Sequence, residues 1–136
     1  SVFRDLIALA RSTKRNGATV WDVDGIRHEF GILGADLDAL WAFTKRNVSQ
    51  GARGGMVMGS GSGFKVAFAT TQHRLGDLAI RVLDRASLSL DDVDGKPTGE
   101  LVHSKLHAFA ISLGGGTTQI QQNIIAERVL GLPRER

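Results

Sequence analysis

The amino-acid sequence predicts an all-α fold, an antiparallel up-and-down bundle of about five helices. Two observations predict this fold class. Apolar residues recur in steps of three and four over long segments, which places them along one face of a helix. Stretches rich in glycine, proline and aspartate separate these segments, and nowhere do apolar and polar residues alternate for long enough to indicate a strand.

We expect the first helix to span residues 3–15. Asn16-Gly17, a pair typical of helix C-termini, follows it. A loop over residues 18–24 follows, in which Asp24 is placed to cap the second helix. The first helix begins without a well-placed capping residue. We therefore expect one domain, residues 1–136, whose first helix is truncated and covers only part of the groove left by the later helices.

Two further apolar stripes with helical spacing predict the second and third helices. A glycine-rich connection at residues 50–61 separates them and is expected to be flexible. Its GSGSG run at residues 59–63 lacks the order of a Rossmann or Walker phosphate loop, and residues 56–58 are too short for the strand that should precede one. The stripes are Ile26, Phe30, Leu33, Leu37, Leu40, Trp41 and Thr44, and then Phe64, Phe68, Thr71, Leu75, Leu78 and Val82.

The fourth helix is expected over residues 102–113, after a surface loop at 87–98 that holds three aspartates, a glycine and a proline. Glycines at 114–116 then break the chain. Thr117 follows them, and threonine is a favoured N-cap residue. It predicts a last helix over residues 117–130.

The composition excludes several functional classes. The net charge of +3 is scattered, with Arg134 and Arg136 contributing, and the chain has no tyrosine, whereas nucleic-acid binders cluster basic residues with aromatic ones. The absence of cysteine rules out disulfides and thiolate metal sites. No segment approaches the ~20 apolar residues of a membrane span and no signal-peptide pattern opens the chain, so the cytoplasm is the expected location.

The sequence predicts no metal site. His103 and His107 lie four residues apart on the fourth helix, as zinc ligands can, but no acidic residue lies between them. Asp91, Asp92 and Asp94 lack the twelve-residue loop and closing glutamate of a calcium site. No Ser-His-Asp or Cys-His set has a supporting local motif.

The most specific motif lies at the C-terminus. Residues 115–134 read GGTTQIQQNIIAERVLGLPR. This run is similar to the closing signature of the acyl-CoA dehydrogenase family, commonly written GGTSEIQRNIIAERVLGLPR. Residues 62–83 resemble the family's long helix without gaps, with Lys65 at a frequently basic position. The resemblance accounts for the whole chain as the family's C-terminal helical domain, beginning part-way through that domain's first helix.

This resemblance implies an activity and partners. In the family a glutamate removes the α-proton of an acyl-CoA thioester, and FAD accepts the β-hydrogen as hydride. An electron-transferring flavoprotein then takes the electrons, and the subunits form homo- or hetero-oligomers, often tetramers. The domains that form most of the flavin and acyl pocket are not part of this sequence. We therefore expect this chain alone to be inactive and not to retain FAD.

The resemblance assigns site residues by position, and it assigns no catalytic residue. Gly115 occupies the position of the glutamate base in many members and has no side chain. In others, such as the isovaleryl-CoA and long-chain enzymes, the glutamate is on the domain's first helix, upstream of Ser1 here. Gly116 matches the glycine beside the thioester, while Thr117 and Gln119 match residues that contact FAD.

The match is weaker where flavin contacts cross a subunit interface. The family often has Gln-x-x-Gly-Gly at the end of the third helix, where residues 81–85 of this chain read RVLDR. Glycines let a pyrophosphate approach the backbone, whereas Asp84 brings a negative charge that Arg81 or Arg85 has to compensate. Arg81 is therefore the third candidate FAD-binding residue.

Three hypotheses stay open. The chain belongs to an active acyl-CoA dehydrogenase whose base lies upstream, or to a non-catalytic subunit of a mixed oligomer in which a partner supplies the base or the flavin site. The third hypothesis is a helical module without redox function, in which Thr117 and Gln119 only cap a helix.

Overall fold

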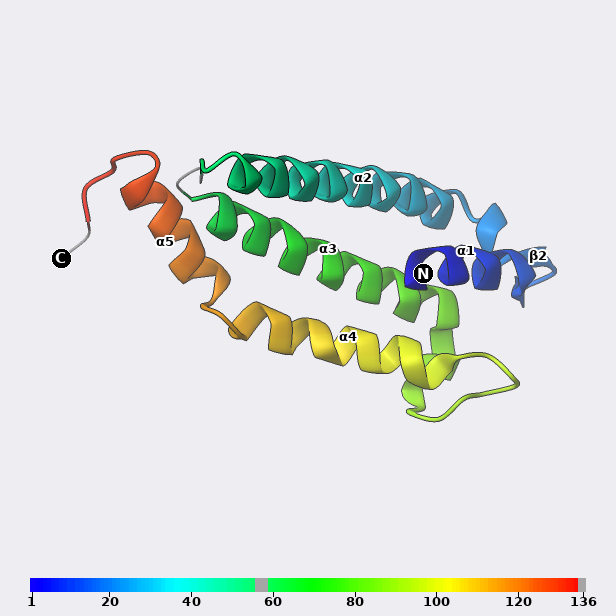
Figure 1. Cartoon of the computed structure of the whole chain (residues 1–136). Coiled ribbons are helices and arrows are strands. Elements are labelled where there is room, and N and C mark those ends of the chain that lie inside the picture. The colour runs from blue at the N-terminus through cyan, green and yellow to red at the C-terminus, as the bar shows by residue number, and fades with distance from the viewer. Residues whose placement is uncertain (56–58, 135–136) are drawn as a thin grey trace.

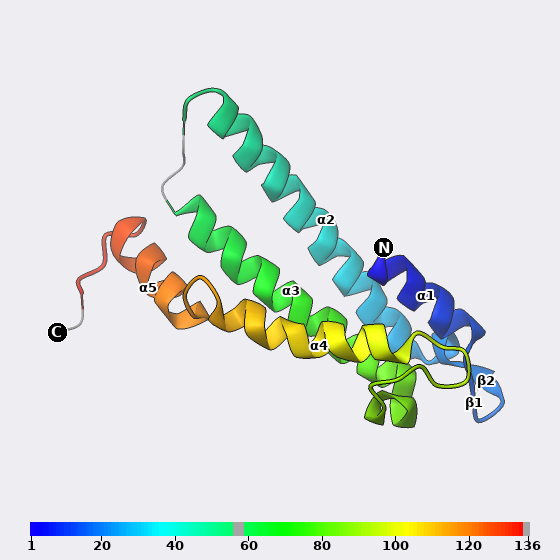
Figure 2. The ribbon, with the colours of Figure 1, turned by 60° about the horizontal axis from the view of Figure 1, so that its bottom comes forward.

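The computed structural model describes residues 1–55 and 59–134, and its five α-helices confirm the predicted all-α class. They are α1 (Val2–Ser12), α2 (Asp24–Ala52), α3 (Ser60–Leu83), α4 (Thr98–Leu113) and α5 (Thr118–Arg128). The central helix is α3, which contacts each of the other four. Helices α2 and α4 run antiparallel to α3 on either side of it, and α5 leaves α4 at an angle and reaches the end where α3 begins (Figures 1 and 2).

The hydrophobic core lies at the other end of α3, because apolar faces of four helices meet there. Its fully buried members include Leu6 of α1, Val20 and Val82. Helix α1 covers only the first part of α2, where the rings of Phe3 and Phe30 lie 5.9 Å apart. Farther along α2, Trp41 of the predicted stripe is 60% exposed. The later part of α2 thus carries an exposed aromatic side chain.

The segment after α1 corrects the sequence prediction. Helix α1 ends at Ser12, and Asn16-Gly17 joins two short antiparallel strands, β1 (Lys14–Arg15) and β2 (Ala18–Thr19). Both turn residues have positive φ, 52° and 85°, as a two-residue hairpin turn requires. The prediction of helix up to residue 15, and of a chain without strands, was therefore wrong here. Asp24 is the first residue of α2 and makes no capping hydrogen bond.

The glycine-rich connection is shorter than predicted, because α2 continues to Ala52 and α3 already begins at Ser60. The MVM run at residues 56–58 lies outside the described residues. Gly59 has φ +80°, and a Cβ atom there would lie 2.3 Å from Cγ2 of Val129. Glycine is thus required where the end of α5 packs against the start of α3.

The crossing of α3 and α4 also depends on a glycine. A Cβ atom on Gly76 would lie 3.0 Å from Cα of Lys105, so the two backbones approach more closely than any larger side chain permits. Nζ of Lys105 lies 2.5 Å from Oδ1 of Asp77 beside this crossing. The close contact fixes where α4 lies along α3.

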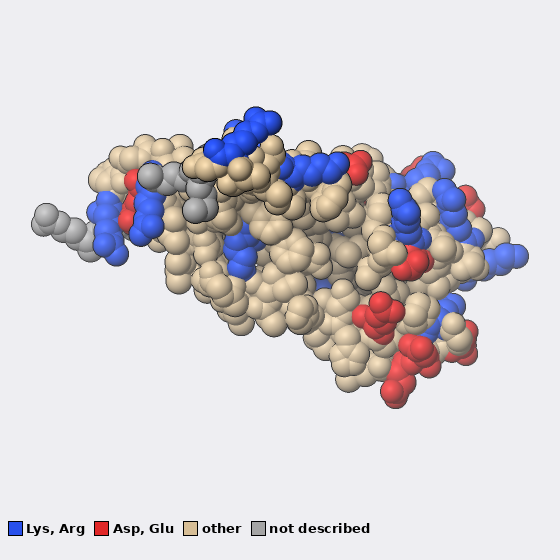
Figure 3. Space-filling view, viewed as in Figure 1, with Lys and Arg blue, Asp and Glu red and all other residues tan. Residues whose placement is uncertain are grey.

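In Figure 3 most acidic side chains of the visible face lie at one end, where basic side chains also lie, and the middle of that face is mostly uncharged. Helix α4 contributes large exposed apolar residues, namely Leu106, Phe109 and Leu113. Within residues 1–55 and 59–134, every helix is too short or too polar to cross a bilayer.

Candidate functional site

The turn between α4 and α5 consists of three glycines, residues 114–116, and therefore has no side chains of its own. Gly115 and Gly116 have φ values of +70° and +95°, which favour glycine. A Cβ atom on Gly116 would lie 2.8 Å from Nε2 of Gln121. The side chain of Gln121 thus fills the space beside Gly116, whereas the backbone of Gly114 and Gly115 is exposed.

The N-terminus of α5 begins directly after this turn. The backbone N–H of Ile120 donates to Oγ1 of Thr117 over 3.4 Å, which confirms the predicted N-cap. The first helical hydrogen bond from a backbone amide is that of Gln121 to the Thr117 carbonyl. The amides of Thr118 and Gln119 precede it and have no helical acceptor. Such donors, at the positive end of a helix dipole, suit an anionic group such as a flavin pyrophosphate.

Gly115 gives the turn no acid or base. A Cβ atom there would meet only Cε of Lys65, at 3.7 Å, so space for a side chain exists. The positive φ of Gly115 is nevertheless a conformation that other residues adopt at a cost. The position that holds the base in many family members thus carries neither a proton acceptor nor a backbone suited to one.

The turn is tied to both neighbouring helices. From α5, Nε2 of Gln121 donates to the Gly115 carbonyl over 2.7 Å. From α3, Nζ of Lys65 donates to the Ile111 carbonyl near the end of α4. These contacts link the turn to α3 over a sequence distance of 46 residues.

The C-terminal end of α3, where the third flavin candidate lies, is built differently. Asp84 follows the helix with φ 53° and ψ −126°. The guanidinium of Arg15 donates to the carbonyls of Arg81 and Val82, each over 3.1 Å, and its Nε lies 3.5 Å from Oδ2 of Asp84. The charge of Asp84 is therefore balanced by Arg15, not by Arg81 or Arg85 as the sequence suggested.

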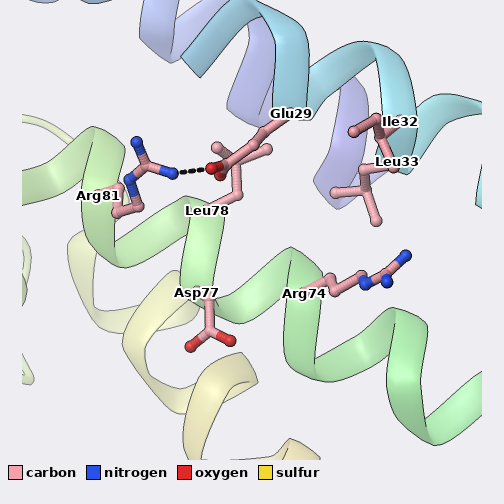
Figure 4. A pocket seen from close by; sticks show the side chains of 7 residues that line it. All are labelled: Glu29, Ile32, Leu33, Arg74, Asp77, Leu78 and Arg81. Atoms are coloured by element: carbon pink, nitrogen blue, oxygen red, sulfur yellow. Dashed lines mark hydrogen bonds and ion pairs between the residues drawn. The ribbon is translucent and has the colours of Figure 1, made fainter. Parts of the chain in front are cut away.

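The side chain of Arg81 borders a cavity of about 390 Å³ between α2 and α3. Figure 4 shows it pointing across this cavity to Glu29, with which it forms an ion pair. Arg74 borders the same cavity and pairs with Asp36. Because both guanidinium groups face carboxylates, the cavity is no anion pocket as it stands.

The structure does not bring the three candidate FAD-binding residues together within one chain. Thr117 and Gln119 lie where α5 begins, whereas Arg81 lies in the last turn of α3. That end of α3 is the end away from α5 (Figure 1). One chain therefore places these candidates near opposite ends of α3.

The remaining polar candidates are used for folding or are exposed. His103 and His107 both lie exposed on α4, and the described residues contain no group of three potential metal ligands. Oδ1 of Asp92 accepts a hydrogen bond from the N–H of Gly99 over 3.1 Å. This contact holds the acidic loop against the first turn of α4.

Comparison with known proteins decides the family. A model of the acyl-CoA dehydrogenase C-terminal domain matches residues 1–130. The chain belongs to the acyl-CoA dehydrogenase family. The resemblance predicted from the C-terminal signature is thus confirmed, and it covers nearly the whole chain.

Two curated members match about half of the chain. Acyl-CoA dehydrogenase IpdE1 of Mycobacterium tuberculosis is 40% identical over 74 residues, which are 52% of this chain and 18% of that protein. The protein of the same name from Mycolicibacterium smegmatis is 41% identical over 71 residues, 52% of this chain and 17% of that protein. The match thus spans less than a fifth of the length of these relatives.

Solved structures share the fold at lower identity. The ChsE4-ChsE5 complex from Mycobacterium tuberculosis has a TM-score of 0.84 at 23% identity, over 98% of this chain and 35% of that chain. The steroid acyl-CoA dehydrogenase Tcur3481-Tcur3483 has a TM-score of 0.82 at 18% identity, over 98% and 34%. The FAD complex of PigA has a TM-score of 0.82 at 18% identity, over 96% and 32%. This chain therefore spans about a third of the length of these neighbours.

Sequence reasoning missed the residues that hold the two regions in place. Lys65 was noted only as a basic position, and Arg15 only as part of a helix that ends earlier. Both bind backbone carbonyls of distant segments, and no local pattern predicts such contacts. The available signal for Lys65 was that its neighbours in the sequence are apolar. A lysine that is half-buried among apolar residues needs an acceptor for its ammonium group.

Proposed function

We propose that this chain is the C-terminal helical domain of an FAD-dependent acyl-CoA dehydrogenase that introduces a double bond between the α and β carbons of an acyl-CoA thioester. The match of residues 1–130 to the family's C-terminal domain carries this proposal. The free amides at the N-terminus of α5 support it, because they suit an anionic cofactor. An electron-transferring flavoprotein is the expected electron acceptor.

The residues of this domain position the reactants. Gly116 lies beside the thioester, at the position that the family resemblance assigns to it. The first turn of α5, with Thr117 and Gln119, faces the flavin. Arg81 reaches the flavin of a neighbouring subunit after leaving Glu29. When bound, FAD supplies the hydride acceptor.

The general base lies outside this sequence in the leading proposal, on the segment that precedes Ser1. A second candidate function is a non-catalytic subunit whose partner supplies the base. The lack of a side chain at Gly115 and the presence of Asp84 near the expected interface favour it. The two-protein complexes among the structural neighbours also support it.

The flavin assignment is tested by Gln119→Ala in the full-length protein. Loss of one cofactor hydrogen bond lowers FAD affinity by about tenfold, measured by retention of the flavin during gel filtration and by titration of the apoprotein. Gln122→Ala is the matched control, because Gln122 is an exposed amide on the same helix. Unchanged FAD affinity in Gln119→Ala removes the assignment of this residue.

The two candidate functions differ in stoichiometry. An active homo-oligomer contains as many FAD molecules as chains and oxidises acyl-CoA when purified alone. A non-catalytic subunit has no activity alone and gains it with a second acyl-CoA dehydrogenase chain, with fewer flavins than chains. Native mass spectrometry of the full-length protein, combined with flavin absorbance, separates these outcomes.

A further inference from the structure

The C-terminal end of α4 carries carbonyl groups that the helix itself does not satisfy. The Ala110 carbonyl accepts from the N–H of Gly114 over 2.8 Å. The next carbonyl, that of Ile111, accepts from Nζ of Lys65. Lys65 lies in the second turn of α3 and is half-buried. An ammonium group at this place is favourable, because the C-terminus of a helix is the negative end of its dipole.

A second residue of α3 contacts the next residue of α4. Nε2 of His73 lies 2.6 Å from Oγ of Ser112, and the rings of His73 and Phe109 lie 5.0 Å apart. Lys65 and His73 are eight residues apart, so both project from the same face of α3. The last turn of α4 is therefore held to α3 through two successive residues, Ile111 and Ser112.

Lys65 also supports the turn itself. Its Cε lies 3.7 Å from the place of a Cβ atom on Gly115, so its stem lies under that glycine. On the other side, Gln121 of α5 donates to the Gly115 carbonyl. The backbone at Gly115 and Gly116 is thus held between a cation from α3 and an amide from α5.

We propose that Lys65 is a positioning residue for the reaction, which fixes the α4–α5 turn so that Gly116 and the amides of Thr118 and Gln119 face the thioester and the flavin. This inference rests on the proposed function. Lys65 acts through the backbone and needs no contact with either molecule. Its charge matters because a neutral stem of similar length leaves the Ile111 carbonyl without its donor.

The test compares Lys65→Met, which keeps the stem and removes the charge, with Lys65→Arg, which keeps a donor. Both are made in the full-length protein. Within residues 114–120, the N–H groups of Gly114 and Ile120 are hydrogen-bonded. Amide hydrogen exchange at these two positions is expected to rise at least about fivefold in Lys65→Met, since the turn loses one of its two anchors. FAD affinity is expected to fall by about tenfold. In Lys65→Arg the exchange rate and the FAD affinity are both expected to stay within about twofold of those of the parent protein.

Lys45→Met is the matched control. Lys45 is an exposed lysine of α2 that lies 5.3 Å from the ring of Trp41, and its replacement leaves exchange at residues 114–120 unchanged. Gln121→Ala is the second variant, which releases the turn from α5 without touching the α3–α4 contact. It raises exchange in the same residues, even if Lys65→Met does not fold.

Two results overturn the proposal. One is unchanged exchange at residues 114–120 in Lys65→Met, and the other is a rise of the same size in all helices, which makes Lys65 a general stabilising residue. Absence of FAD from the parent protein contradicts the proposed function instead. The exchange measurement still decides in that case whether Lys65 holds the turn.

Discussion

The two ends of α3 are built by opposite means. Where α3 begins, Lys65 supports a turn of glycines with positive φ and no charged side chain of its own. Where α3 ends, a positive φ occurs at Asp84, and Arg15 holds both its carboxylate and the last carbonyls of the helix. A charged residue can thus adopt a positive φ, which glycine adopts without strain, provided that a partner binds its side chain.

The largest expected effect is at the glycine turn. Gly116→Ala forces alanine into φ +95° and against Gln121, and we expect the free energy of unfolding to fall by about 2 kcal/mol. Denaturant unfolding of the variant and the parent protein measures this difference. The same strain is expected to weaken FAD binding in the full-length protein.

Gly61→Ala is the control for this substitution. Gly61 lies in the first turn of α3 with no atom within 4 Å of a Cβ atom, and alanine there raises stability by about 0.5 kcal/mol through its helix preference. Equal losses in both variants would show that the turn has no special geometry.

At the C-terminal end of α3 we expect a substitution to raise the free energy of unfolding. Asp84→Gly removes the strain of a non-glycine residue at φ 53° and ψ −126°, and we expect a gain of about 1 kcal/mol. Asp84→Asn is compared with it, because asparagine keeps the shape and removes the charge that faces Arg15. A thermal melt that shows Asp84→Gly to be less stable than the parent contradicts the strain argument.

The smallest effect is expected for Arg81. Its ion pair with Glu29 is nearly half exposed on both sides, with side-chain exposures of 47% and 43%, and such pairs contribute about 0.5 kcal/mol or less. Arg81→Met therefore changes stability little, whereas FAD affinity of the full-length oligomer falls by about tenfold if Arg81 binds a neighbour's flavin. Arg85→Met is the matched control, and an equal effect of both would remove Arg81 as a flavin residue.

The sequence predicted the elements whose signals are local. Thr117 caps α5 as expected, because a capping threonine needs only the three residues that follow it. The apolar stripe of α2 contains the buried residues Ile26, Phe30 and Leu33, yet Trp41 of the same stripe is 60% exposed. Periodicity identifies a face of the helix, but the neighbours in the fold decide how much of that face is buried.

The errors arose where one local signal fits two structures. Asn16-Gly17 can end a helix or form a hairpin turn, and the hairpin prevails because β1 and β2 pair across it. Serine and glycine at residues 60 and 61 suggested a connection, but Phe64 of α3 lies against Phe43 of α2, with ring centroids 6.5 Å apart, and tertiary contacts of this kind override weak helix propensity. The partners of Lys65 and Arg15 could not be predicted, because they lie in distant segments.

The absent side chain of Gly76 has a consequence for the far end of α4. The contact with Lys105 acts as a pivot, and Gly115 lies ten residues beyond it, about 15 Å away along a helix. A rotation of about 5° at the pivot displaces the turn by about 1 Å at this lever length. Misplacement of that size is enough to impair a catalytic arrangement. The position of the glycine turn therefore depends on how closely two backbones meet at Gly76, as well as on the contacts of Lys65 and His73 nearer the turn.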